Sequence, residues 1–133
     1  MTDQALIPIR SDADIVTARQ HGRALAAQLG FPTSDQVLIA TVVSELARNI
    51  VEYAGQGEIA LTLVQRGSQD GVKVVARDHG PGIADIEQAM QDGYSTSKSL
   101  GLGLPGSRRM MDEFEIVSKV GKGTTVTATK WMR

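Results

Sequence analysis

The chain lacks cysteine entirely and has no long apolar segment among its 133 residues. The absence of cysteine excludes a disulfide framework and cysteine-centred metal sites. No segment approaches the roughly 18 consecutive apolar residues of a transmembrane helix, so none is predicted. The N-terminus has neither a basic region nor a long apolar run, and no signal peptide is expected. These absences favour a cytoplasmic protein with no membrane partner.

Net charge is also nearly absent, at -1. Without an excess of positive charge, no general affinity for nucleic acid or anionic membranes is expected. Hydrophobic residues make up 41% and charged residues 22%, which is the balance of a globular chain rather than a disordered one. A chain of 133 residues has material for one hydrophobic core, so we expect a single domain over residues 1–133.

A strand and a helix are predicted at the start of the chain. Residues 5–10 alternate weakly, and Pro8 limits this strand to a sheet edge because proline cannot donate a ladder hydrogen bond. Ser11 is the expected N-cap of the helix that follows. Gly30 is its expected C-cap, so the helix should end at about residue 29.

A second helix and a hairpin are predicted next. Ser34 is a favourable N-cap, and we expect this helix to continue to about Tyr53. Apolar and polar residues alternate in 58–66, and 72–78 is rich in valine, which predicts two strands. The short polar turn at 67–71 joins them into a β-hairpin.

The second half of the chain contains further helices and strands. We expect a short helix at 84–91, a polar segment without periodicity at 93–103, a helix at 105–112, and strands at 115–120 and 124–131. The complete order predicts an α+β fold, a two-layer sandwich with one mixed, mostly antiparallel sheet covered by helices.

Glu45 and Asn49, in the second predicted helix, are four residues apart and share one helix face. A carboxylate can act as a base or position a hydroxyl group, and a carboxamide oxygen is a suitable ligand for Mg²⁺. Taken alone, the pair is more simply explained as two solvated polar residues on an ordinary amphipathic helix.

Asp78 ends a predicted strand, and Gly80 and Gly82 lie in the turn that follows. Glycines permit unusual backbone angles and close approach by a flat ligand. A carboxylate at this position can accept a hydrogen bond from an exocyclic amine such as that of adenine. The alternative is an ordinary turn, in which aspartate and glycine are common.

Gly101, Gly103 and Gly106 precede or begin the helix predicted at 105–112. Free backbone N–H groups at a helix N-terminus can bind phosphate. The spacing is formally G-x-G-x-x-G, but the polar run 95–99 precedes it instead of a strand, so a dinucleotide-binding Rossmann unit is not indicated. The motifs that accompany a Walker A loop or a protein-kinase glycine loop are missing as well. A phosphate cradle of another kind stays possible.

In this order and spacing, the three segments resemble the N, G1 and G2 boxes of the GHKL superfamily, which shares the Bergerat ATP-binding fold. They are Ser44-Glu-Leu-Ala-Arg-Asn-Ile50, Asp78-His-Gly-Pro-Gly-Ile83 and Gly101-Leu-Gly-Leu-Pro-Gly106. Near the end of the chain, Gly123-Thr124-Thr125 resembles the element whose threonine helps to hold adenine. The resemblance implies ATP as the cofactor, and we assign the adenine contact to Thr125.

The sequence is most similar to the anti-sigma-factor serine/threonine kinase family, and within it to the switch kinases of bacterial stress signalling. Met111-Asp-Glu-Phe114 and Lys130-Trp-Met-Arg133 also resemble this group, so the similarity covers nearly the whole chain. It implies an ATP-dependent kinase that phosphorylates STAS-domain regulatory proteins. For switch kinases, it also implies a phosphatase partner that is activated by direct binding.

The resemblance also implies a role for each matching residue. Glu45 would orient or deprotonate the attacking hydroxyl group, Asn49 would bind Mg²⁺, and Asp78 would receive adenine N6, with Gly80 and Gly82 allowing the base to approach. Phosphoryl transfer needs mainly positioning and charge neutralisation, so this set is sufficient. Residues 95–100 would form a mobile lid. The remaining expected nucleotide contacts are Ile83, Ser95, Thr96, Ser97, Lys98, Gly101, Leu102, Gly103, Leu104 and Thr125.

Two other interpretations stay open at this point. A non-catalytic module could bind ATP as a conformational ligand and act by sequestering a protein, as an anti-sigma factor does. An ATPase without a protein substrate is the second alternative. Glu45 favours catalysis over a pure binding role, because a binding module needs no base.

Overall fold

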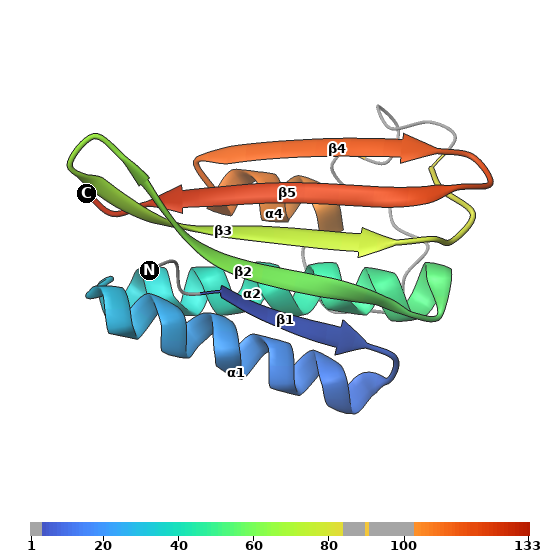
Figure 1. The fold of residues 1–133 in the computed structure, drawn as a ribbon, viewed down its shortest axis with the longest axis horizontal. Helices are drawn as coiled ribbons and strands as arrows, with labels where there is room; N and C mark the ends of the chain where they lie inside the picture. Colours follow the sequence, from blue (N-terminus) through green and yellow to red (C-terminus); the bar gives the residue numbers. More distant parts are fainter. Residues whose placement is uncertain (1–3, 84–89, 91–102) are drawn as a thin grey trace.

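The computed structural model describes residues 4–83, 90 and 103–133. In this part of the chain, five strands form one sheet in the order β1-β2-β3-β5-β4, with the helices packed on one face (Figure 1). The elements are β1 (Gln4–Ile9), α1 (Asp12–Leu29), α2 (Thr33–Asn49), η1 (Ile50–Ala54), β2 (Gly57–Arg66), β3 (Gln69–Asp78), α4 (Gly103–Met110), β4 (Glu113–Lys119) and β5 (Gly123–Trp131). The predicted two-layer α+β fold is confirmed. No described helix is long and apolar enough to span a membrane.

The sheet separates a covered face from a bare one. All four strand pairings of the described residues are antiparallel, so the expected mixed sheet is antiparallel throughout this part. Successive side chains of a strand point to opposite faces. The inward set is fully buried beneath the helices and includes Ile59, Leu61, Val72, Val74 and Ala128. No described helix packs on the opposite face, which carries both polar side chains such as Lys73 and apolar ones such as Leu6 and Val117.

The strand β1 lies at the sheet edge, where Pro8 is tolerated as predicted. The helix α1 follows and ends as predicted at Gly30, which has φ +92°. The N–H groups of Gly30 and Phe31 donate to the carbonyls of Ala27 and Ala26, which is the Schellman pattern. Ser11 occupies the N-cap position, but no side-chain capping bond is made there by the described residues.

The second helix begins earlier than predicted, whereas its helical run ends close to the predicted residue, at Ala54. Its N-cap is Pro32 rather than Ser34, and α2 starts at Thr33. The fixed φ of proline, here -57°, suits a helix entrance, and its missing N–H would have no partner there. Beyond Asn49 the chain widens into the π-helical turn η1. Such single π turns are frequent at functional sites.

The remaining predicted elements shift by a few residues. The β2–β3 turn is shorter than 67–71, because the strands extend to Arg66 and from Gln69. The helix predicted at 105–112 is α4, and the last two strands begin at Glu113 and Gly123. The helix predicted at 84–91 and most of the segment 93–103 lie outside the described residues.

Candidate active site

The helix α2 carries Glu45 and Asn49 toward its C-terminal end. Glu45 is buried, with 5% of its surface exposed, and Asn49 is half-buried. Carboxylates are rarely buried so deeply without a specific partner or role, because the charged form loses its hydration. The predicted shared helix face is therefore not an ordinary solvated surface. The roles of base and Mg²⁺ ligand stay predictions.

Asp78 ends β3 on the covered side of the sheet, in register with Gly57 of β2 and Thr124 of β5. Its Oδ1 accepts the backbone N–H of Gly80 at 2.9 Å and that of Thr124 at 3.3 Å. Among the hydrogen bonds that join described residues, its Oδ2 accepts none. The carboxylate is thus fixed through one oxygen, and the expected contact of Asp78 with the exocyclic amine of adenine stays a prediction.

Gly80 and Gly82 are both required by packing within the protein. A Cβ on Gly80 would lie 2.6 Å from Cβ of Ala54 in η1. Gly82 has φ +78°, and a Cβ there would overlap the carbonyl oxygen of Lys119. The expected role of both glycines in the approach of the adenine base stays a prediction beside this structural requirement.

The structure does not place Thr125 beside Asp78, and this assignment is corrected. Thr125 pairs with Arg77, so its side chain lies on the bare face of the sheet. Thr124, one residue earlier, pairs with Asp78 and donates to its carboxylate. The sequence offers two adjacent threonines, and only the strand register decides which of them faces the site. We therefore move the expected adenine-side role to Thr124.

The loop after Asp78 is held by the turn between β4 and β5, which lies beside it at one end of the sheet (Figure 1). Ile83 donates its N–H to Oγ of Ser118 at 2.7 Å. Gly121 donates its N–H to the carbonyl of Pro81 at 2.8 Å. No local sequence pattern indicates Ser118, because it belongs to no motif and lies 35 residues from Ile83.

The predicted phosphate-binding residues are only partly described. Gly103 is the first residue of α4, and Leu104 packs partly buried against the hydrophobic core. The other expected contacts of this segment, Ser95, Thr96, Ser97, Lys98, Gly101 and Leu102, lie outside the described residues. In α2, Nε of Arg48, just before Asn49, is buried and has no hydrogen-bond partner among the described residues.

A metal ion would receive few protein ligands here. Within the described residues, no group of three histidine, cysteine or acidic side chains could hold one. Mg²⁺ in nucleotide sites commonly takes one or two side-chain ligands together with phosphates and water. Asn49 as a single side-chain ligand fits that pattern.

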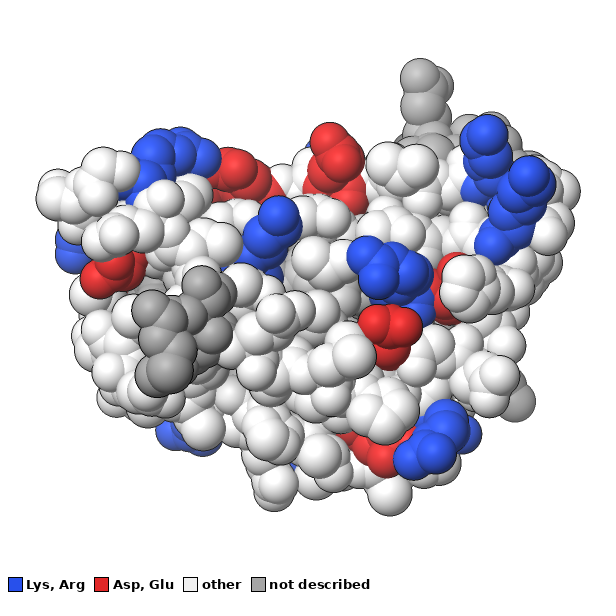
Figure 2. Space-filling view, viewed as in Figure 1, with Lys and Arg blue, Asp and Glu red and all other residues white. Residues whose placement is uncertain are grey.

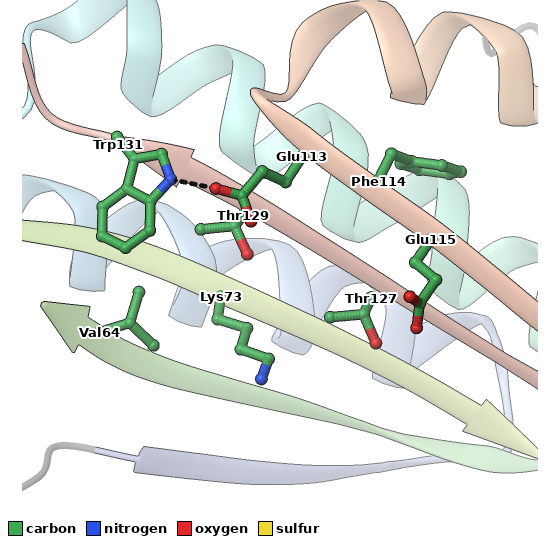
Figure 3. A pocket seen from close by; sticks show the side chains of 8 residues that line it. All are labelled: Val64, Lys73, Glu113, Phe114, Glu115, Thr127, Thr129 and Trp131. Atoms are coloured by element: carbon green, nitrogen blue, oxygen red, sulfur yellow. Dashed lines mark hydrogen bonds between the residues drawn. The ribbon is translucent and has the colours of Figure 1, made fainter. Parts of the chain in front are cut away.

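A separate hollow lies on the bare face of the sheet (Figure 3). Its volume is about 470 Å³, and its lining residues are Val64, Lys73, Glu113, Phe114, Glu115, Thr127, Thr129 and Trp131. Acidic and basic side chains are interspersed over the surface in this view, with no large patch of one sign (Figure 2). The inward-facing carboxylate of Asp78 lies on the other face, so this hollow is distinct from the candidate active site.

Comparison with known proteins identifies the family. Residues 9–130 match the model described as "Histidine kinase-like ATPase domain", and the chain belongs to this family. It is 52% identical over 133 residues to "Serine/threonine-protein kinase RsbT" of Bacillus subtilis (strain 168), covering 100% of both chains. It is 35% identical over 120 residues to "Anti-sigma F factor" of Caldanaerobacter subterraneus subsp. tengcongensis, covering 86% of this chain and 83% of that relative.

Solved structures share the fold. The RsbU and RsbW domains of Rv1364c from Mycobacterium tuberculosis match with a TM-score of 0.61 and 22% identity, over 99% of this chain and 32% of that chain. The mycobacterial sensor histidine kinase MprB matches with a TM-score of 0.57 and 14% identity, over 100% of this chain and 99% of that chain. The predicted membership of the anti-sigma-factor kinase group is confirmed by the sequence relatives. The protein is an ATP-using serine/threonine kinase of partner-switching signalling.

Proposed function

We propose that this kinase phosphorylates STAS-domain regulatory proteins on serine or threonine and activates a partner phosphatase by binding to it. The observation that supports this most strongly is the 52% identity to RsbT along the full length of both chains. The proposed setting is the bacterial cytoplasm, and the proposed functional unit is a single domain over residues 1–133.

The geometry of α2 and β3 supports a division of roles at the site. Asp78 would accept a hydrogen bond from the adenine amine through Oδ2, because Oδ1 already receives two backbone N–H groups. Glu45 would orient the hydroxyl group of the protein substrate and accept its proton. Bound ATP supplies the phosphoryl group, and Mg²⁺ offsets its negative charge. The chain itself positions the reactants, which is the main requirement of phosphoryl transfer.

Asn49 is the proposed side-chain ligand of Mg²⁺. Asn49→Ala should weaken ATP binding in the presence of Mg²⁺ and leave the much weaker binding in its absence nearly unchanged. Isothermal titration calorimetry with and without Mg²⁺ measures both. Equal ATP affinities of wild type and variant at every Mg²⁺ concentration contradict the assignment.

A second function is favoured by a specific observation, the 35–37% identity to several anti-sigma F factors. Such a protein would act by sequestering a sigma factor, with ATP controlling the contact. Glu45 separates the two proposals, since sequestration does not need a proton acceptor at this position.

Glu45→Gln provides the decisive experiment. The substitution preserves size and hydrogen-bonding capacity but removes the carboxylate, and a positioned general base contributes roughly 10²–10⁴ in rate. We expect phosphate transfer to a co-purified STAS-domain protein to fall by that factor under single-turnover conditions. ATP affinity and partner binding should change little.

Glu52→Gln is a matched control, because Glu52 is exposed and lies one to two turns further along, in η1. It should transfer phosphate at the wild-type rate. If the wild-type protein transfers no phosphate to any bound partner while ATP still controls partner binding, the kinase proposal is wrong. The sequestering function then takes its place.

A further inference from the structure

A single hydroxyl group, that of Ser118 in β4, joins three parts of the chain. Its Oγ accepts the N–H of Ile83 at 2.7 Å, lies 2.8 Å from Oγ1 of Thr124, and lies 3.2 Å from the carbonyl of Gly123. Ser118 is half-buried on the same side of the sheet as Asp78, because it pairs with Thr124 across the β4–β5 hairpin.

The hydrogen-bonding capacity of this hydroxyl group is fully used. A serine hydroxyl offers one donor and two acceptor positions. The consistent arrangement has Ser118 donating to the carbonyl of Gly123 and accepting from the N–H of Ile83 and the hydroxyl of Thr124. An alanine at this position would leave the half-buried N–H of Ile83 without this partner.

The loop between Asp78 and Ile83 is thereby attached to one hairpin at both ends. At its start, Oδ1 of Asp78 accepts the N–H of Thr124, and at its end Ile83 donates to Ser118. Ser118 and Thr124 face each other in the β4–β5 register. The distance between the two ends of the loop is therefore set by a paired hairpin rather than by the loop itself.

We infer that Ser118 is a positioning residue of the nucleotide site: its hydroxyl group fixes the loop that follows the adenine-reading Asp78. The inference rests on the proposed role of Asp78 and this loop in ATP binding. Ser118 acts through Ile83 and Thr124 and needs no contact with the nucleotide. Loss of its hydroxyl group should weaken nucleotide binding and leave the chemical step nearly unchanged.

The test compares Ser118→Ala, which removes the hydroxyl group, with Ser118→Thr, which retains it in a residue suited to strands. Ser68→Ala is the matched control, because Ser68 lies exposed in the β2–β3 turn. Removing one neutral hydrogen bond corresponds to about a 3- to 10-fold weaker Kd for ATP. We expect that loss in Ser118→Ala, with kcat at saturating ATP within about twofold of wild type.

A second readout needs no nucleotide. Hydrogen exchange of the ligand-free protein should show faster exchange of the Ile83 amide in Ser118→Ala and near wild-type exchange in Ser118→Thr and Ser68→Ala. If Ser118→Ala folds poorly, Ser118→Cys keeps the size and weakens the acceptor. It should then show the same two changes to a smaller extent.

The outcomes separate this inference from the proposed function. Wild type that fails to bind ATP overturns both. Wild type that binds ATP, together with a Ser118→Ala variant of equal ATP affinity, overturns only the role of Ser118. A variant with a lowered melting temperature but an unchanged Kd for ATP shows a purely structural role, which also contradicts the inference.

Discussion

The two ends of the β3–β5 pairing each combine a glycine with a carboxylate, but their surroundings differ. At one end Asp78 faces Thr124, and at the other Gly71 faces Trp131. Each end has a carboxylate that receives two hydrogen bonds on one oxygen. Asp78 receives them from backbone N–H groups, whereas Oε2 of Glu113 receives them from the side chains of Trp131 and Arg66 at 2.6 and 2.5 Å.

The ends differ in what occupies the space that glycine provides. At the far end, Gly71 makes room for the indole of Trp131, and the Arg66 guanidinium lies 4.3 Å from the ring centroid. The indole thus fills the space beside Gly71, and it also forms one wall of the hollow on the bare face (Figure 3). At the Asp78 end, Gly80 admits only the small side chain of Ala54. A glycine beside a carboxylate therefore does not define a ligand site, and the neighbouring side chains decide the outcome.

The largest expected difference between substitutions at the two ends is their effect on ATP affinity. Asp78→Asn removes the charge that the adenine amine is proposed to meet, and a hydrogen bond to a charged group contributes about 1.5–3 kcal/mol. The Kd for ATP should rise about 10- to 100-fold. Calorimetry measures the change, with GTP as a competitor.

Asp112→Asn is the control at the far end, where Oδ2 of Asp112 accepts the N–H of Trp131 at 2.7 Å. This variant should lower stability and leave ATP affinity intact. If Asp78→Asn binds ATP normally and GTP competes equally in wild type, adenine is recognised elsewhere and the comparison fails.

Gly71→Ala should act on stability alone. A Cβ at this position would lie 2.7 Å from Cε3 of Trp131 and 2.8 Å from the carbonyl oxygen of Lys130. Overpacking of this kind costs about 1–3 kcal/mol, because the backbone must shift. Urea unfolding measures the loss of free energy, and the Kd for ATP should be unchanged.

Adding Trp131→Leu to Gly71→Ala sharpens this prediction. The smaller side chain removes the contact with the ring but not that with the Lys130 carbonyl. Gly71→Ala should therefore lower the free energy of unfolding by less in the Trp131→Leu background than in wild type. A smaller loss should remain, because the contact with the Lys130 carbonyl persists. An equal loss of unfolding free energy in both backgrounds contradicts the proposed contact with the ring.

The smallest expected effect is the pH dependence of stability that Glu113 contributes at the Trp131 end. Hydrogen bonds from Trp131 and then Arg66 lower the pKa of Glu113 below its ordinary value of 4.5. A lowered folded-state pKa stabilises the protein above the unfolded-state value, and this contribution is lost as the pH falls through the folded-state pKa. Glu113→Gln should thus lower the melting temperature at pH 7, and the difference should shrink in acid.

Glu115→Gln is the control for this series, because Glu115 lies on the same strand face and forms no ion pair with another described residue. Its melting temperature should follow that of wild type at each pH. A Glu113→Gln difference that stays constant from pH 7 to pH 3 would show that the effect is not electrostatic.

Local physics explains what the sequence determined by itself. The alternation in 58–66 predicts the strand β2, and Ile59 and Leu61 of one face prove to be buried, because successive side chains of a strand point to opposite sides. Gly30 predicted the end of α1, because glycine adopts a positive φ without strain. The shared helix face of Glu45 and Asn49 followed from the helical repeat alone.

Contacts between distant segments determine the details of the candidate site. The choice of Thr124 over Thr125 depends on the β3–β5 register, since a shift of one residue exchanges the faces of every side chain in the strand. The link from Ser118 to Ile83 joins residues 35 apart, and no local pattern contains it. The sequence could therefore nominate Asp78 and its loop, but only the tertiary structure shows the hairpin that holds them, because hydrogen bonds between strands are set by the packing of the whole sheet.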